Sequence, residues 1–251
     1  MEVGMAPRRR PDALPRFQTA SGAVVTIDAP GYDLGHPWLG AFRVQVARQY
    51  AATAPGLQER FFQVAPVGNC GPIIERDLRG RVTDELSFAG GRFIVARSAV
   101  DDRVLMAWQG QWHEVFDFVN DGAISLAHAL GRFDRLTFTD SPLGVRVGVG
   151  SVPKESISAE RVYKRIPGVG DITIIPAVNA TELVPRWRGA TTRSGETWRK
   201  NVDTSEGGSG SVLLHASAAA FTVLQPDVPG EVGDRQLAFL DELVKIAWDP
   251  A

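Results

Sequence analysis

The chain has 251 residues, of which 44% are hydrophobic and 22% are charged. These proportions are ordinary for a globular protein that buries a sizeable core. Its 27 basic and 29 acidic residues leave a net charge of −2, so no excess of positive charge points to nucleic acid or to an anionic membrane surface. Every apolar run is shorter than the roughly 20 residues needed to cross a bilayer, and we expect no membrane segment.

The chain contains a single cysteine, which excludes an internal disulfide and a zinc site made of several cysteines. A lone cysteine fits a reducing compartment, and we predict a cytoplasmic location. Arginine strongly outnumbers lysine, which is typical of a GC-rich genome and favours a bacterial source. Three arginines between prolines, without a following apolar run, indicate a flexible leader over residues 1–16. Residues 17–251 are predicted to form one globular domain, and a subdivision near residues 141–155 stays open.

The first element with clear periodicity is predicted to be a helix over about residues 38–53. Trp38, Phe42, Val46 and Tyr50 recur every four residues, as on one face of a helix.

The stretch from about residue 57 to residue 120 is predicted to be β structure. It consists of short runs rich in branched and aromatic side chains, and Gln109-Gly110 has the composition of a hairpin tip. Successive side chains of a strand point to opposite faces, so we expect His113 and Asp117 to share one face and Glu114 to lie on the other.

Two further helices are predicted, a short one in the middle of the chain that ends at Gly131 and a C-terminal one over about residues 234–248. The C-terminal helix is inferred from Leu237, Leu240, Leu243, Val244 and Ala247, which would line one helix face. Short strands joined by tight turns fill the space between these helices. The predicted fold class is therefore α+β, with a mainly antiparallel sheet.

Cys70 lies in the small-residue stretch GNCGP and poses a choice between a nucleophile and core packing. A catalytic thiol needs a nearby base, and His113 is the candidate. Asp117 is a poor partner for His113, because residues four apart on a strand are too distant to touch. Free cysteine is among the most buried residue types, which favours core packing for Cys70.

No motif for a metal, a phosphate or another cofactor is present, and we predict none. The histidines form no H-x-H or H-x-x-x-H pair; they lie at His36, His113, His128 and His215. His215 stands among small apolar residues, where a hydrogen-bonded core histidine is the ordinary case. The stretch GVGSVPKES resembles a phosphate-binding loop, but Pro153 and Glu155 replace its second glycine and its hydroxyl residue.

The most suggestive stretch is residues 185–202, which combine two tryptophans with several cationic side chains and which we call the basic segment. Trp and Arg are the residues most enriched at binding hot spots. The candidate binding residues are Arg186, Trp187, Arg188, Arg193, Trp198 and Arg199. In the alternative interpretation the segment is a hairpin whose tryptophans pack onto the sheet beneath arginine stems.

The sequence thus favours a soluble intracellular binding or assembly protein that contacts a protein partner through the basic segment. Nucleic acid is disfavoured by the net charge, and the oligomeric state is left open. The alternative is a cysteine-dependent hydrolase or transferase with Cys70 as nucleophile and His113 as general base, so the question of enzyme activity stays open.

Overall fold

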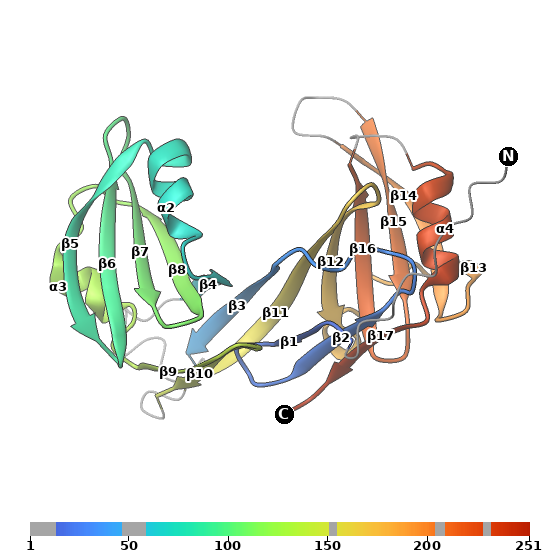
Figure 1. Ribbon diagram of the computed structural model, residues 1–251, viewed down its shortest axis with the longest axis horizontal. Coiled ribbons are helices and arrows are strands. Elements are labelled where there is room, and N and C mark those ends of the chain that lie inside the picture. Colours follow the sequence, from blue (N-terminus) through green and yellow to red (C-terminus); the bar gives the residue numbers. More distant parts are fainter. Residues whose placement is uncertain (1–13, 47–58, 151–154, 204–208, 228–231) are drawn as a thin grey trace, which may run out of the picture. The chain divides into compact units, whose positions relative to one another are not determined.

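The computed structural model describes residues 14–46, 59–150, 155–203, 209–227 and 232–251 (Figure 1). Its chain divides into two compact units. Unit 1 comprises Met1–Arg16, Val25–His36 and Lys164–Asp249, and unit 2 comprises Phe17–Val24, Pro37–Tyr163 and Pro250–Ala251. Nearly all of the predicted leader lies outside the described residues, and the single domain over residues 17–251 stays a prediction.

The predicted α+β class is wrong, because the fold is mostly β. Strands account for 55% of the structure and helical elements for 12%. The strands of unit 2 are β3 (Trp38–Val46), β4 (Arg60–Pro66), β5 (Gly80–Phe88), β6 (Gly91–Ser98), β7 (Arg103–Gln109), β8 (His113–Asn120), β9 (Leu136–Ser141) and β10 (Gly144–Val149). The strands of unit 1 include β12 (Gly170–Pro176), β13 (Ala190–Thr191), β14 (Glu196–Asp203), β15 (Ser209–Ala216), β16 (Ala220–Pro226) and β17 (Lys245–Asp249). A unit boundary falls within β1 (Arg16–Gln18), β2 (Val24–Asp28) and β11 (Glu155–Ile166).

Within the described ranges the helical elements are few and short. They are α2 (Cys70–Pro72), which continues into the π-helical turn η1 (Ile73–Asp77), then α3 (Leu126–Gly131), the 3₁₀ turn η2 (Ala177–Asn179) and α4 (Asp234–Glu242). The predicted short middle helix is present as α3, where the Ser125 side chain accepts a hydrogen bond from the backbone N–H of His128 at 3.2 Å. Among the described residues no helix is long and apolar enough to span a membrane.

The predicted helix over residues 38–53 is a strand in its described part. Residues 38–46 form β3, and residues 47–53 lie outside the described residues. A spacing of four is also a multiple of two, so Trp38 and Phe42 lie on one face of a strand as readily as on one face of a helix. Phe42 and Val44 are buried, and β3 pairs with β4 in antiparallel register. Pairing with β4 makes this segment a strand, and the periodicity of the sequence does not reveal that pairing.

The predicted C-terminal helix ends earlier than expected. The helix stops at Glu242, Leu243 takes an extended conformation, and the chain continues as β17. The backbone N–H of Val244 donates to the carbonyl of Asp28 at 2.9 Å, which brings β17 beside β2. Leu237, expected on the buried face, is 46% exposed.

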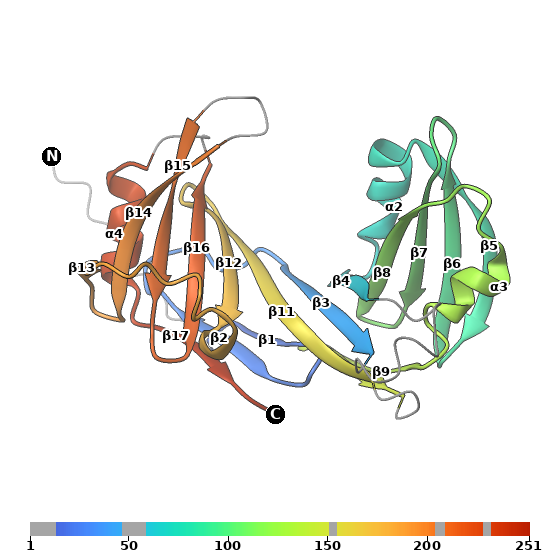
Figure 2. The same ribbon diagram turned by 180° about the vertical axis from the view of Figure 1, so that it is seen from behind.

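Unit 2 is built around an antiparallel sheet that contains β4, β8, β7, β6 and β5 in that order. The turn of α2 and η1 packs against one face of this sheet, as both views show (Figures 1 and 2). Their buried residues meet side chains from β4, β6, β7 and β8 in one apolar cluster: Ala65, Cys70, Ile74, Leu78, Ile94, Ala96, Leu105, Ala107 and Phe116.

Unit 1 contains an antiparallel run of strands in the order β13, β14, β15, β16 and β12. One apolar cluster of this unit consists of Ile175, Ala180, Trp198, Val212, Leu214 and Phe221. Helix α4 buries Phe239 and Leu240, and its Gln236 amide donates to the carbonyl of Val169 at 2.7 Å. The basic segment belongs to this unit, at the β13–β14 edge of the sheet.

Candidate functional site

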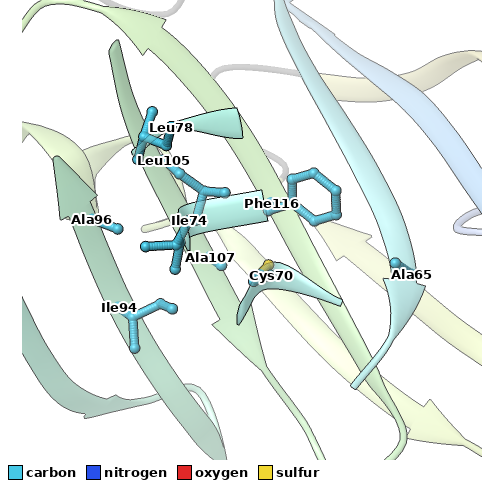
Figure 3. Packing of buried hydrophobic residues seen from close by; sticks show 9 residues of the cluster. All are labelled: Ala65, Cys70, Ile74, Leu78, Ile94, Ala96, Leu105, Ala107 and Phe116. Atoms are coloured by element: carbon cyan, nitrogen blue, oxygen red, sulfur yellow. The ribbon is translucent and has the colours of Figure 1, made fainter. Parts of the chain in front are cut away.

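The Cys70 thiol lies inside the apolar cluster of unit 2. Its side chain is buried among Ile74, Ala107 and Phe116, as Figure 3 shows. Burial raises the pKa of the thiol strongly, and the negative charge of Glu114 raises it further. A reactive cysteine needs the opposite environment, with a positive neighbour and access to solvent. The thiol therefore stays protonated and serves as packing material.

The small-residue stretch around Cys70 is the start of a helical turn that a distant carboxylate caps. Glu114 of β8 accepts hydrogen bonds from the backbone N–H groups of Gly68, at 2.9 Å, and Cys70, at 2.7 Å. Its side chain also accepts from the amide of Gln109 at 2.7 Å and is fully buried. The first N–H groups of a helix have no partner within the helix, and a carboxylate is well suited to satisfy them. Glu114 thus fastens the turn to β8 through these backbone hydrogen bonds.

His113 has a carboxylate partner, but the partner is Asp140 of β9. The Nδ1 atom of His113 lies 2.8 Å from a carboxylate oxygen of Asp140, and the Phe17 ring meets the imidazole edge-on at a centroid distance of 6.4 Å. Asp140 also accepts a hydrogen bond from the backbone N–H of Trp112 at 2.6 Å. The pair therefore ties the β7–β8 turn to β9.

The structure does not assemble the predicted catalytic group. Glu114 reaches the Cys70 turn, and successive residues of a strand point to opposite faces, so His113 projects away from the thiol. Asp117 instead accepts a hydrogen bond from Nε of Arg132 at 2.9 Å. The expectation that Asp117 would not orient His113 is confirmed. Nothing in this geometry activates Cys70 as a nucleophile.

The two tryptophans of the basic segment have opposite environments. Trp198 is 5% exposed and packs in the apolar cluster of unit 1, whereas Trp187 is 63% exposed. The indole N–H of Trp198 donates to the backbone carbonyl of Trp187, with 2.8 Å between Nε1 and the oxygen. Trp198 therefore packs as the packed-hairpin interpretation predicts, whereas Trp187 is exposed, and its role in recognition stays a prediction.

The basic segment carries a marked local charge. It contains five basic residues and one acidic residue, Glu196, which gives +4 against −2 for the whole chain. All five cationic side chains are exposed, and within the described part of the chain none of them forms an ion pair: Arg186, Arg188, Arg193, Arg199 and Lys200. Unpaired exposed arginines next to an exposed indole are available for contact with another molecule.

Exposed apolar side chains also gather in the connection that leads from β12 to the basic segment. Val178 in η2 is 84% exposed and Leu183 is 50% exposed. The connection is compact, because the N–H groups of Leu183 and Val184 both donate to the carbonyl of Ala180, at 2.8 Å and 3.3 Å. Val178, Leu183 and Trp187 are thus presented by a single ordered stretch of chain.

The sequence interpretation missed three side chains that organise these regions, namely Glu114, Asp140 and Ser194. Ser194 lies in the turn between β13 and β14, and its Oγ is 3.0 Å from Nε2 of His215. Each of these contacts joins residues far apart in the chain, so no local motif marks them. The predicted core role of His215 agrees with its 1% exposure.

The described residues contain no group of three or more His, Cys, Asp or Glu side chains that could hold a metal ion. Comparison of the chain with protein-family models, with curated proteins and with solved structures finds no match.

Proposed function

We propose that the protein is a binding or assembly component that holds a protein partner through the basic segment, with Trp187 as the anchor. The observation that carries the proposal is the position of this indole. It is 63% exposed, although its backbone carbonyl is fixed by the buried Trp198. A residue whose backbone is fixed before binding loses less conformational entropy when a partner covers its side chain. Tryptophan is also among the residues that dominate binding energy at interfaces.

The charge of the segment indicates what kind of partner fits. The segment that contains Trp187 also carries five exposed cationic side chains without ion pairs in the described structure, and they favour an acidic surface. The exposed Val178 and Leu183 on the preceding connection offer apolar contacts that a phosphate backbone would not use. An acidic protein surface with an apolar pocket for the indole therefore fits better than a nucleic acid.

The proposal is tested by quantitative capture from an extract of the source organism. The bait proteins are the wild type, Trp187→Ala, and Trp112→Ala as a matched control. Trp112 is also an exposed tryptophan, at 43%, but it lies in unit 2. We expect an acidic protein to be retained by the wild type and by Trp112→Ala, and to be lost with Trp187→Ala.

Two results would contradict the proposal. One is an identical set of retained proteins for all three baits. The other is retention that depends on Trp187 but disappears after nuclease treatment, which would replace the protein partner with a nucleic acid.

A further inference from the structure

Three polar side chains form a row across β14, β15 and β16 of unit 1. The register pairs Thr197 with His215, and it pairs His215 with Thr222. Residues directly opposite each other on antiparallel strands point to the same face, with Cβ atoms about 4.5–5.5 Å apart. The two threonine hydroxyls therefore flank the imidazole on one face of the sheet. We call these three side chains the threonine–histidine row.

Each member of the row carries a buried polar atom that has no hydrogen-bond partner among the residues that the structure describes. These atoms are Oγ1 of Thr197, Nδ1 of His215 and Oγ1 of Thr222. The three residues are 7%, 1% and 1% exposed. Buried polar groups in folded proteins are nearly always hydrogen-bonded, either to protein or to ordered water. Three such atoms on neighbouring positions therefore point to a shared partner.

We infer that an internal water molecule binds at the threonine–histidine row and bridges His215 Nδ1 to the hydroxyls of Thr197 and Thr222. A buried water makes about three hydrogen bonds, which matches the three atoms that need one. The other ring nitrogen of His215 is already bonded to Ser194, so only Nδ1 requires a partner. Water and hydroxyl groups both donate and accept, and the network closes with either tautomer of the imidazole.

A neutral ligand suits this row better than an ion. The row contains no carboxylate, and the described residues offer no metal-binding group of three or more His, Cys, Asp or Glu side chains. Burial also lowers the pKa of His215 to about 4, which keeps the imidazole neutral near pH 7. An ion buried without an opposite charge is strongly disfavoured. This inference is independent of the proposed partner.

Substitution of each threonine by the isosteric valine tests the inference, because a bridging water and unpartnered hydroxyls predict opposite changes in the midpoint of thermal unfolding. If a water bridges the row, Thr197→Val and Thr222→Val each leave the buried water with one missing hydrogen bond. The midpoint of thermal unfolding should then fall by about 2–6 °C in each variant. If the hydroxyls have no partner, removal of either one should leave the midpoint unchanged or raise it. Thr173→Val, at a half-buried threonine on the other face of β12, is the matched control and should change the midpoint by about 1 °C or less.

A high-resolution crystal structure of the wild-type protein would show directly whether a water molecule occupies the row. We expect a well-ordered water within hydrogen-bonding distance of all three atoms, and Thr222→Ser, which keeps a hydroxyl, should retain it. Direct bonds between the hydroxyls and Nδ1 with no water present would overturn the inference. A raised or unchanged midpoint in the correctly folded valine variants would overturn it as well.

Discussion

The indole N–H of Trp198 donates a hydrogen bond to the backbone carbonyl of Trp187 across 2.8 Å, and this contact joins a buried ring to the backbone of a residue whose own ring is exposed. Trp198 belongs to the apolar cluster of unit 1, so it does not move freely. The backbone of Trp187 is therefore held by the interior of the unit. Two tryptophans in one short segment thus have different environments, because only Trp198 packs against the sheet.

Trp198→Phe should lower both stability and partner binding. Phenylalanine keeps most of the apolar volume but loses the hydrogen bond to the Trp187 carbonyl, and we expect the free energy of unfolding to fall by about 1–2 kcal/mol. Urea unfolding measures the loss. Trp187→Phe removes no buried contact and should stay within about 0.5 kcal/mol of the wild type. Equal losses for the two variants would show that Trp187 is also packed.

The Cys70 thiol should not react with thiol reagents while the protein is folded. Burial and the nearby carboxylate of Glu114 raise its pKa, so even at pH 9 the folded protein presents almost no thiolate. The measurement is the rate of reaction with a disulfide reagent across pH, with and without denaturant. We expect reaction only in denaturant. A fast reaction of the folded protein below pH 8 would restore the nucleophile interpretation.

Glu114→Gln should loosen the turn formed by α2 and η1. The carboxylate accepts from two backbone N–H groups and from Gln109. An amide of the same shape turns its NH₂ group toward at least one of these donors. We expect a loss of about 2–4 kcal/mol in the free energy of unfolding. Amide hydrogen exchange at Gly68 and Cys70 should accelerate, and Cys70 should become reactive toward thiol reagents in the folded state. The exposed Glu85→Gln serves as a control that should change neither readout.

His215 should make unit 1 less stable at acidic pH. Its pKa is lowered by burial to about 4 in the folded state, against an ordinary value of 6.5. The unfolded chain therefore binds the proton more tightly. The contribution of His215 to stability is complete above about pH 6.5, and it is lost as the pH falls to about 4. The shift corresponds to about 3 kcal/mol.

The measurement for this prediction is the free energy of unfolding from urea titrations between pH 4 and pH 8. His215→Gln removes the titrating group, and the slope between pH 6.5 and pH 4 should become shallower by the His215 contribution. Parallel curves for the variant and the wild type would mean that His215 is protonated equally easily in both states.

The sequence predicted local features better than long-range ones. The short helix that ends at Gly131 is confirmed, and the Ser125 side chain that caps its first turn is a near neighbour in the chain. The helix over residues 38–53 is wrong in its described part, since a spacing of four also fits a strand and pairing with β4 selects β3. The C-terminal helix was also predicted too long, because strand pairing cannot be read from local spacing. Pairing beside β2 draws the last residues into β17.

The candidate site shows the same limit. An arginine-rich segment with two tryptophans is visible in the sequence, but the exposed fraction of each ring depends on the strands that they meet. Likewise, the partners of Cys70 and His113 are Glu114 and Asp140, which are 44 and 27 residues away. No spacing rule predicts such contacts. They form only when β8 has paired with β4 and β7 and other parts of the chain have packed against it.

The central claim, that Trp187 anchors an acidic partner, is tested most directly by the dissociation constant of the purified partner for three proteins. Trp187→Ala should weaken binding by about 30-fold or more, as expected for a hot-spot residue, with an unchanged unfolding midpoint. Trp112→Ala should bind like the wild type, and higher salt should weaken wild-type binding because the basic segment contributes charge. Equal dissociation constants for the wild type and Trp187→Ala would contradict the account.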